Sequence, residues 1–145
     1  MRPSETPTIL VVEDEVLIRE DAIDVLEHEG FEALRAGSAG EAMAILDRRS
    51  DVQAVFTDIQ MPGDRDGIDL ARYLARWRPS LPVLVTSGRS FAAPADLPAS
   101  SRFVPKPYMP RRVATILREM ITDARGPWPG GADPPGGIRG SPATT

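Results

Sequence analysis

The chain has 145 residues, including 15 prolines and 12 glycines but no cysteine, and its formal net charge is −4. This length suits one domain with a proper core rather than two, and the absence of cysteine excludes disulfides, thiolate catalysis and cysteine-ligated zinc. The negative charge gives no electrostatic reason to expect nucleic acid or an anionic membrane as a partner, and since neither a signal peptide nor a run of about 20 apolar residues is evident, we expect a soluble, cytoplasmic protein.

The first part of the chain predicts a strand, a helix and a second strand. Residues 1–7 are polar and proline-bearing, and we expect them to form a flexible arm. The apolar run 9–12 predicts a buried strand, and residues 16–29 carry apolar side chains at helical spacing. Gly30 is suited to end that helix, and residues 31–35 predict the second strand.

A second helix, a third strand and a third helix follow. Ser38 is expected to cap the second helix, because Glu41 stands three residues later at the spacing of a capping box. The apolar run 54–56 predicts a strand that ends at Asp58, and a loop, residues 61–67, leads to the third helix. The face of that helix expected to be buried consists of Leu70, Ala71, Leu74 and Trp77.

The last part of the domain is regular except at one place. Residues 83–85 and 103–104 predict the fourth and fifth strands, and a final helix begins at Pro110 with an unbroken apolar stripe. A helix is expected between the two strands, but Pro94 and Pro98 interrupt the pattern there. Any helix in that segment should therefore be short or irregular.

Strands that alternate with helices predict the fold class. We expect an α/β domain over residues 8–125, with a doubly wound, five-stranded parallel sheet and four or five helices. Residues 126–145 hold six glycines and five prolines. Such a composition buries too little apolar surface to offset the entropy of ordering it, so we expect a disordered tail.

Polar residues of one chemical kind follow the ends of four predicted strands. They are Glu13-Asp14, Asp58, Thr86-Ser87 and Lys106. The carboxyl ends of parallel strands share one edge of the sheet, and ligands bind at that edge in open α/β sheets. The set therefore predicts a site for Mg²⁺ and a phosphoryl group.

The carboxylates indicate how that site would work. Carboxylates about 5 Å apart repel by roughly 3 kcal/mol per pair at an effective dielectric near 20, so the cluster favours a divalent cation. Oxygen ligands with open water positions favour Mg²⁺, and we expect Asp14 and Asp58 to bind it directly and Glu13 through water. Asp58 is the expected nucleophile and would form an aspartyl phosphate, with charge offset by the metal and Lys106.

These residues resemble the receiver domain of two-component response regulators, of the single-domain type. The resemblance covers about residues 8–124. No single motif is specific, but all of them occur in order and at receiver-like spacing. The matching stretches are Val11-Val12-Glu13-Asp14-Glu15, Thr57-Asp58-Ile59-Gln60-Met61-Pro62-Gly63, Asp66-Gly67, Val85-Thr86-Ser87 and Val104-Pro105-Lys106-Pro107-Tyr108.

The resemblance implies roles for individual residues. Asp58 would take phosphate from a sensor histidine kinase or a histidine phosphotransfer protein, in a reaction that the receiver itself catalyses rather than as an enzyme on another substrate. The metal would also bind the main-chain carbonyl of Gln60. The hydroxyl of Thr86 would bond a phosphoryl oxygen, and Phe103 would turn inward on activation.

The resemblance also implies features of the fold and of signalling. It implies the flavodoxin-like strand order 2-1-3-4-5 and a cis peptide between Lys106 and Pro107. The segment after the last helix is too short for a DNA-binding or catalytic domain, so output is expected from the receiver surface itself. The face that follows Thr86 could also support a homodimer. The kinase and the downstream target are not identified by the sequence.

Three departures from the family pattern concern the mouth of the site. The loop after Asp58 has one residue more than the usual Met-Pro-x-x-Asp-Gly spacing, and prolines interrupt the expected fourth helix. Thr86 is followed by Ser87 and Gly88 rather than by alanine and a larger polar residue. In receivers the positions two after the aspartate and two after the threonine, here Gln60 and Gly88, influence how water reaches the phosphate.

Other functions use similar residues. A phosphohydrolase of the haloacid dehalogenase kind would need a second aspartate where the chain has Gln60, and its nucleophile would lie on the first strand. A degenerate receiver that serves only as a scaffold would lack site residues, whereas all of them are present here. Within the receiver class, a switch on one target, a relay intermediate and a phosphate sink all remain open.

Overall fold

The computed structural model describes residues 6–89 and 93–125 of the chain. Most of the predicted arm and the whole predicted tail lie outside these residues. The elements of the described part are β1 (Thr8–Val12), α1 (Val16–His28), β2 (Glu32–Ala36), α2 (Ala39–Arg48), β3 (Val52–Asp58), α3 (Gly67–Trp77), β4 (Val83–Ser87), β5 (Ser101–Pro105) and α4 (Pro110–Arg125).

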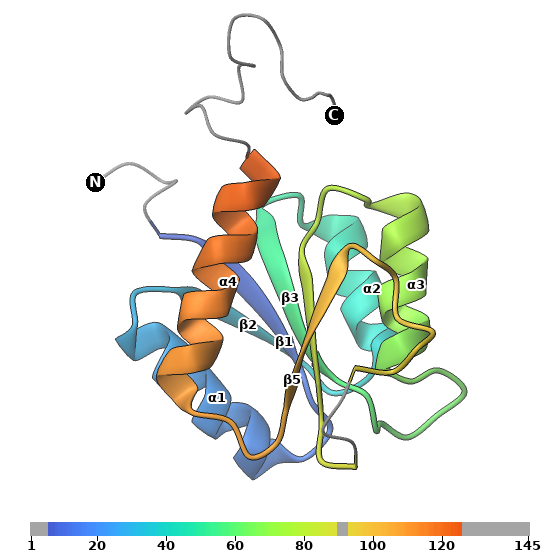
Figure 1. Cartoon of the computed structure of the whole chain (residues 1–145), viewed down its shortest axis with the longest axis horizontal. Coiled ribbons are helices and arrows are strands. Elements are labelled where there is room, and N and C mark those ends of the chain that lie inside the picture. The colour runs from blue at the N-terminus through green and yellow to red at the C-terminus, as the bar shows by residue number, and fades with distance from the viewer. Residues whose placement is uncertain (1–5, 90–92, 126–145) are drawn as a thin grey trace, which may run out of the picture.

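The five strands form one sheet in which every neighbouring pair is parallel, in the order β2-β1-β3-β4-β5. Helices α1 and α4 cover one face of the sheet, and α2 and α3 cover the other (Figure 1). The α/β fold and the strand order are therefore confirmed. Because all strands run in the same direction, their carboxyl ends lie along one edge.

The sequence of each strand reflects its place in the sheet. Every residue of β1 and β4 is buried, because helices cover both faces of these inner strands. Such burial requires the near-continuous apolar runs seen in the sequence. The edge strands β2 and β5 contain buried, half-buried and exposed residues. The innermost strands therefore fix the positions of the residues at their ends most firmly.

The N-terminal caps of α2 and α3 can be compared with the predicted helix starts. The side chain of Ser38 accepts a hydrogen bond from Glu41 N at 3.1 Å, which confirms the predicted cap of α2. The carboxylate of Glu41 accepts from Gly37 N at 2.7 Å rather than from Ser38 N, so the capping box is incomplete. A complete capping box occurs instead on α3, between Asp66 and Asp69.

One residue of the predicted core lies at the surface. Leu70, Ala71 and Leu74 of α3 are buried as expected, but Trp77 is 61% exposed. Trp77 is the last residue of α3, and the guanidinium of Arg76 lies 5.2 Å from the centre of its ring. The helix ends before the stripe completes another turn, so the expectation for Trp77 was wrong.

The segment between β4 and β5 contains turns in its described part, residues 93–100. Leu97 N donates to the carbonyl of Pro94 at 3.2 Å, and Ser101 N donates to that of Pro98 at 2.9 Å. Each turn starts at one of the two prolines that interrupt the sequence pattern. The prediction was that any helix here is short or irregular, and residues 93–100 form turns without a helix.

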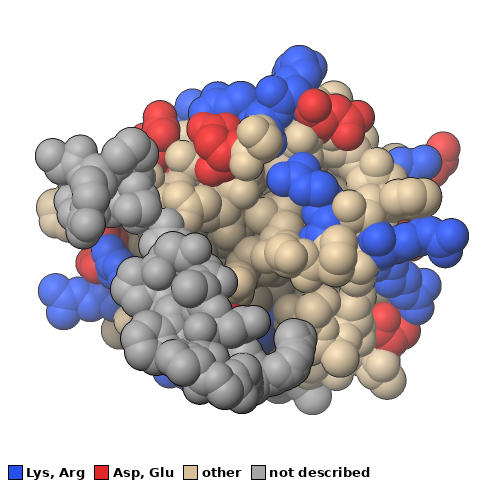
Figure 2. Space-filling view, turned by 90° about the horizontal axis from the view of Figure 1, so that it is seen from above, with Lys and Arg blue, Asp and Glu red and all other residues tan. Residues whose placement is uncertain are grey.

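Charges of both signs occur on the surface. On the face seen in Figure 2, acidic and basic side chains lie near one another around the rim, with uncharged surface between them. Among residues 6–89 and 93–125, no helix combines the length and the apolarity needed to cross a bilayer.

Candidate functional site

The ends of four parallel strands bring the predicted site residues together. Asp58 is the last residue of β3 and pairs in register with Thr86 of β4. Glu13 directly follows β1, and Lys106 directly follows β5. Residues that are up to 93 positions apart in sequence are therefore neighbours in the fold.

A lysine joins two buried carboxylates at the centre of the site. Lys106 Nζ donates to Asp58 Oδ2 at 2.7 Å and to Glu13 Oε1 at 3.4 Å. The other oxygen of each carboxylate accepts a main-chain N–H, Asp58 Oδ1 from Gln60 and Glu13 Oε2 from Glu15, both at 3.1 Å. Asp58 and Glu13 are only 6% and 5% exposed, so these four contacts replace most of their contact with water.

Burial and neighbouring charge shift the proton affinities of this cluster. Burial, together with the adjacent Asp58 carboxylate, raises the pKa of Glu13 to about 7, although the Glu15 amide and Lys106 oppose the shift. Burial alone would lower the pKa of Lys106, but its hydrogen bond to Asp58 and the charges of both carboxylates outweigh burial and raise it. Lys106 therefore stays charged, but its single positive charge does not fully offset two ionised carboxylates, Glu13 and Asp58.

The hydroxyl of Thr86 lies buried in the site without a hydrogen bond. Thr86 is 3% exposed, and among the described residues its Oγ1 has no partner. A buried hydroxyl that makes no hydrogen bond costs free energy, so such groups usually serve a ligand or a second conformation. An acceptor oxygen of a ligand bound beside Thr86 would satisfy this hydroxyl.

Asp14 lies apart from the central carboxylates. It is exposed and borders an open depression that Gln60, Met61, Asp66 and Arg89 also line. Within residues 6–89 and 93–125, no three acidic or histidine side chains converge into a cluster that could hold a metal ion. The structure thus joins Glu13 to Asp58, and it sets Asp14 and Gln60 around the entrance to them.

Two further residues, Gly67 and Ser87, shape the site. A Cβ on Gly67 would lie 2.1 Å from the carbonyl oxygen of Asp58, so only glycine allows α3 to start this close to β3. Ser87 is 1% exposed and donates from its hydroxyl to Gln60 Oε1 at 3.0 Å. The Asp66-Gly67 pair in the sequence signalled the first feature, whereas nothing in the sequence signalled the second.

The two aromatic residues near the site lie on opposite faces of the sheet. Phe103, the expected switch residue, is half-buried and packs with the core under α2 and α3. Tyr108 packs with the core under α1 and α4, its ring edge-on to Phe56 with the centres 5.6 Å apart. The peptide between Lys106 and Pro107 is cis, as the family resemblance implied.

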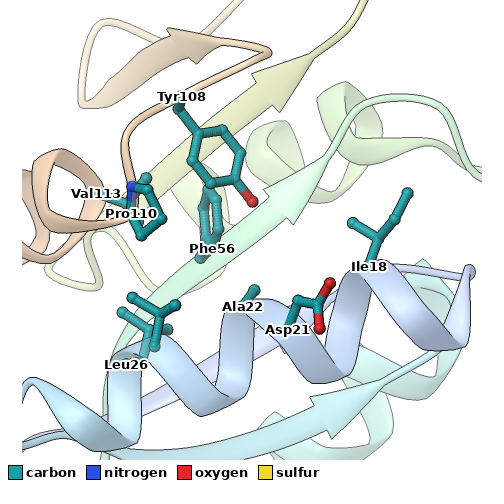
Figure 3. A pocket seen from close by; sticks show the side chains of 9 residues that line it. Ile18, Asp21, Ala22, Leu26, Phe56, Tyr108, Pro110 and Val113 are labelled. Carbon is teal, nitrogen blue, oxygen red and sulfur yellow. The ribbon is translucent and has the colours of Figure 1, made fainter.

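An apolar cavity of about 210 Å³ adjoins Tyr108 (Figure 3). It lies between α1 and the start of α4, and Tyr108 and Phe56 form the wall nearest to the site. The same two side chains border a void of about 10 Å³ that Glu13, Asp58 and Thr86 also line. Ile18 and Ala22 of α1 also line both spaces, so these four side chains lie between the cavity and the charged cluster.

Comparison with known proteins gives one consistent family. The model of the response regulator receiver domain family matches residues 9–118. Sensor kinase CckA of Brucella abortus (strain 2308) is 34% identical over 122 residues, which are 81% of this chain and 13% of that protein. Aerobic respiration control protein ArcA of Escherichia coli (strain K12) is 30% identical over 121 residues, which are 81% of this chain and 50% of ArcA.

A solved structure agrees with the sequence comparisons. The CheY-like response regulator receiver domain protein of Methanospirillum hungatei JF-1 superimposes with a TM-score of 0.73 at 26% identity. The match covers 82% of this chain and 96% of that one. The chain therefore spans nearly all of this receiver structure, but half or less of the two larger curated relatives.

Proposed function

The chain belongs to the response regulator receiver domain family, and we propose that its Asp58 accepts a phosphoryl group from a histidine kinase or a histidine phosphotransfer protein. The observation that carries the proposal is the buried Asp58 carboxylate, which lies 2.7 Å from Lys106 Nζ and pairs with Thr86, whose hydroxyl lacks a partner among the described residues. The nucleophile is thus in contact with a cation, and the residue paired with it on the next strand has a donor available for a ligand.

The proposed reaction uses these three residues in distinct roles. An oxygen of Asp58 forms a bond to phosphorus while the bond from phosphorus to the donor's histidine nitrogen breaks, and that nitrogen then takes up a proton from solvent. Lys106 leaves its ion pair with Asp58 and binds a phosphoryl oxygen, which offsets charge in the transition state. Thr86 donates its hydroxyl hydrogen to another phosphoryl oxygen.

The residues present fit a bound Mg²⁺. This ion binds through one or two carboxylates and keeps several waters, so it does not need three converging acids. The carboxylates of Glu13 and Asp58 lie close together, and Asp14 and Gln60 border the open depression beside them. We propose that Asp14, Asp58 and Gln60 hold the ion and that Glu13 acts through water. Once bound, it would supply positive charge to the phosphoryl oxygens.

We further propose that the chain works as a signalling module rather than as an enzyme with a separate substrate. The hydrolase alternative lacks its general acid, because Gln60 stands at that position. A cytoplasmic location is consistent with the proposed donor, since kinases that phosphorylate receivers use ATP. Switch, relay and phosphate sink differ only in the events that come after phosphorylation of Asp58.

Intact mass after incubation with a small phosphodonor and Mg²⁺ tests the proposed phosphoacceptor. We expect one transient phosphoryl adduct in the parent and none in Asp58→Asn, because an amide cannot replace the carboxylate nucleophile. Addition of EDTA should abolish labelling of the parent. Labelling that persists on another residue in the Asn variant would contradict the assignment of Asp58.

The proposed change of the partner-binding surface needs a separate experiment. Phosphate can shift the balance between two conformations only if it interacts differently with each, and Thr86 supplies such an interaction. We expect beryllofluoride with Mg²⁺ to alter amide hydrogen exchange in residues 89–115, which include Phe103 and the start of α4. Changes confined to the loops after β1 and β3 would refute a signalling role for this face.

A further inference from the structure

Ser87 connects the loop after β3 with the segment after β4. Its hydroxyl oxygen accepts a hydrogen bond from Arg89 N at 3.0 Å, and its hydroxyl hydrogen is donated to Gln60 Oε1 at 3.0 Å. Ser87 is 1% exposed, so water does not compete effectively for these bonds. A hydroxyl group can donate one hydrogen bond, and here Gln60 accepts it.

The bond is not needed to hold the two strands together. Ile59 N already donates to the carbonyl of Thr86 at 2.9 Å, and β3 and β4 are in register up to Asp58 and Thr86. What the bond does determine is the direction of the Gln60 side chain. Its carbonyl oxygen points to Ser87.

Gln60 lies beside both Asp58 and an open depression of the surface. Its main-chain N–H donates to Asp58 Oδ1 at 3.1 Å, and the residue lines the open depression together with Asp14 and Arg89. A glutamine carbonyl at such a position can accept a hydrogen from a water molecule and direct the water's oxygen toward phosphorus. The bond from Ser87 occupies one of the two lone pairs of this oxygen and fixes its direction, which limits the ability of Gln60 to orient such a water.

From this geometry we propose that Ser87 is a positioning residue that withholds the Gln60 carbonyl from water and thereby prolongs the life of the aspartyl phosphate. The inference rests on the proposed phosphorylation of Asp58. In the hydrolysis concerned, a water oxygen bonds to phosphorus and the bond from phosphorus to the Asp58 oxygen breaks. Both hydrogens of the water leave with inorganic phosphate or pass to solvent, and Asp58 regains its carboxylate.

The expected effect is a shorter phosphate lifetime when the hydroxyl is removed. The parent and Ser87→Ala are labelled with a small phosphodonor and Mg²⁺, the donor is removed, and the phosphorylated fraction is followed by intact mass. We expect the lifetime in Ser87→Ala to fall roughly three- to tenfold, the factor that one net hydrogen bond supports. The rate of labelling should change much less, whereas a generally loosened site would alter both.

A double-mutant cycle tests whether the effect passes through Gln60. Ser87→Ala should shorten the lifetime strongly when residue 60 is glutamine and less than about twofold in the Gln60→Ala background. Ser101→Ala is the matched control, because it removes another buried hydroxyl, one without a partner among the described residues. We expect it to leave the lifetime unchanged, and thermal melts establish that each variant is folded.

The outcomes separate this inference from the proposed function. A parent chain that takes up no phosphate on Asp58 refutes the proposed function, and the inference falls with it. A labelled parent whose lifetime equals that of Ser87→Ala refutes the inference alone. An equal shortening by Ser87→Ala with and without Gln60 also refutes it, because the effect then does not pass through Gln60.

Discussion

The ends of the strands and the loops that follow them differ in how firmly the fold holds them. Glu13, Asp58 and Thr86 are each 6% exposed or less, and hydrogen bonds or packing hold every one of them. By contrast, residues 62–65 after β3 and residues 88–89 after β4 are all exposed. The reacting groups are thus held by packed residues, whose substitution costs much free energy of folding. The loops beside them are exposed, and substitutions there cost little.

The test with the largest expected effect concerns Gly67. This residue ends the loop after β3, and the end of β3 at Asp58 packs directly against it. A Cβ there would overlap the carbonyl of Asp58, so α3 would have to move away from β3. We expect Gly67→Ala to lower the free energy of unfolding by roughly 3 kcal/mol and to impair labelling of Asp58. Urea denaturation and intact mass measure the two effects.

Gly40 provides the matched control for that substitution. It lies within α2, and a Cβ there would meet only Ser38 Oγ, at 4.0 Å. Gly40→Ala should therefore raise the free energy of unfolding by about 0.5–1 kcal/mol, because alanine loses less backbone entropy in a helix. A Gly67→Ala protein as stable as the parent would show that loop and strand end are independent.

The second test concerns Asp14, which lies at the entrance rather than in the buried cluster. A ligand at 100 times its dissociation constant stabilises the folded state by about 2.7 kcal/mol, so saturating Mg²⁺ should raise the melting temperature of the parent. Asp14→Ala should melt like the parent without Mg²⁺ and hardly respond to it. Equal upward shifts in the two proteins would remove Asp14 from the proposed metal site.

The third test measures how the stability of the metal-free protein depends on pH, which reports on the buried carboxylates. Burial raises the pKa of Glu13 from its ordinary value of 4.5 to about 7. Folding therefore favours the neutral form of Glu13. This contribution to the stability of the folded protein is fully present below about pH 4.5 and is lost as the pH rises to about 7. Between about pH 5 and pH 7.5 we expect the parent to lose on the order of 1–2 kcal/mol more than Glu13→Gln.

Urea denaturation in EDTA at the two pH values measures that difference. Mg²⁺ should reduce it, because a cation favours the ionised form of Glu13. Parallel pH dependence in the parent and in Glu13→Gln would mean that Glu13 is ionised in the folded protein throughout this range. The carboxylates would then be less crowded than their burial indicates.

The sequence was most informative where burial leaves little choice of residue. Inner strands covered on both faces require apolar runs, and the polar residue that ends each run is therefore conspicuous, as at Asp58. The same reasoning failed for Trp77, because periodicity shows which residues share a face but not where the helix ends. Asp14, which was expected to bind the metal together with Asp58, is exposed and borders the open depression, so its role as a ligand stays a prediction.

Side-chain hydrogen bonds between distant residues were beyond the sequence. Gln60 and Ser87 stand 27 residues apart, and each is compatible with several partners. Glu41 likewise stands at capping-box spacing from Ser38, yet it bonds to Gly37. In both cases the residue types were evident, but the choice of partner depends on distances of a few tenths of an ångström that only the packed fold determines.

The loop after β3 suggests a practical use. Gly63 has a positive φ of 102°, is exposed, and among the described residues has no neighbour within 4 Å of a Cβ built on it. Lengthening a surface loop adds only a slowly growing entropy cost. A circularly permuted fluorescent protein inserted after Gly63 would therefore disturb no packed contact. Because it would lie five residues from Asp58, it would convert occupancy of the site into an optical signal.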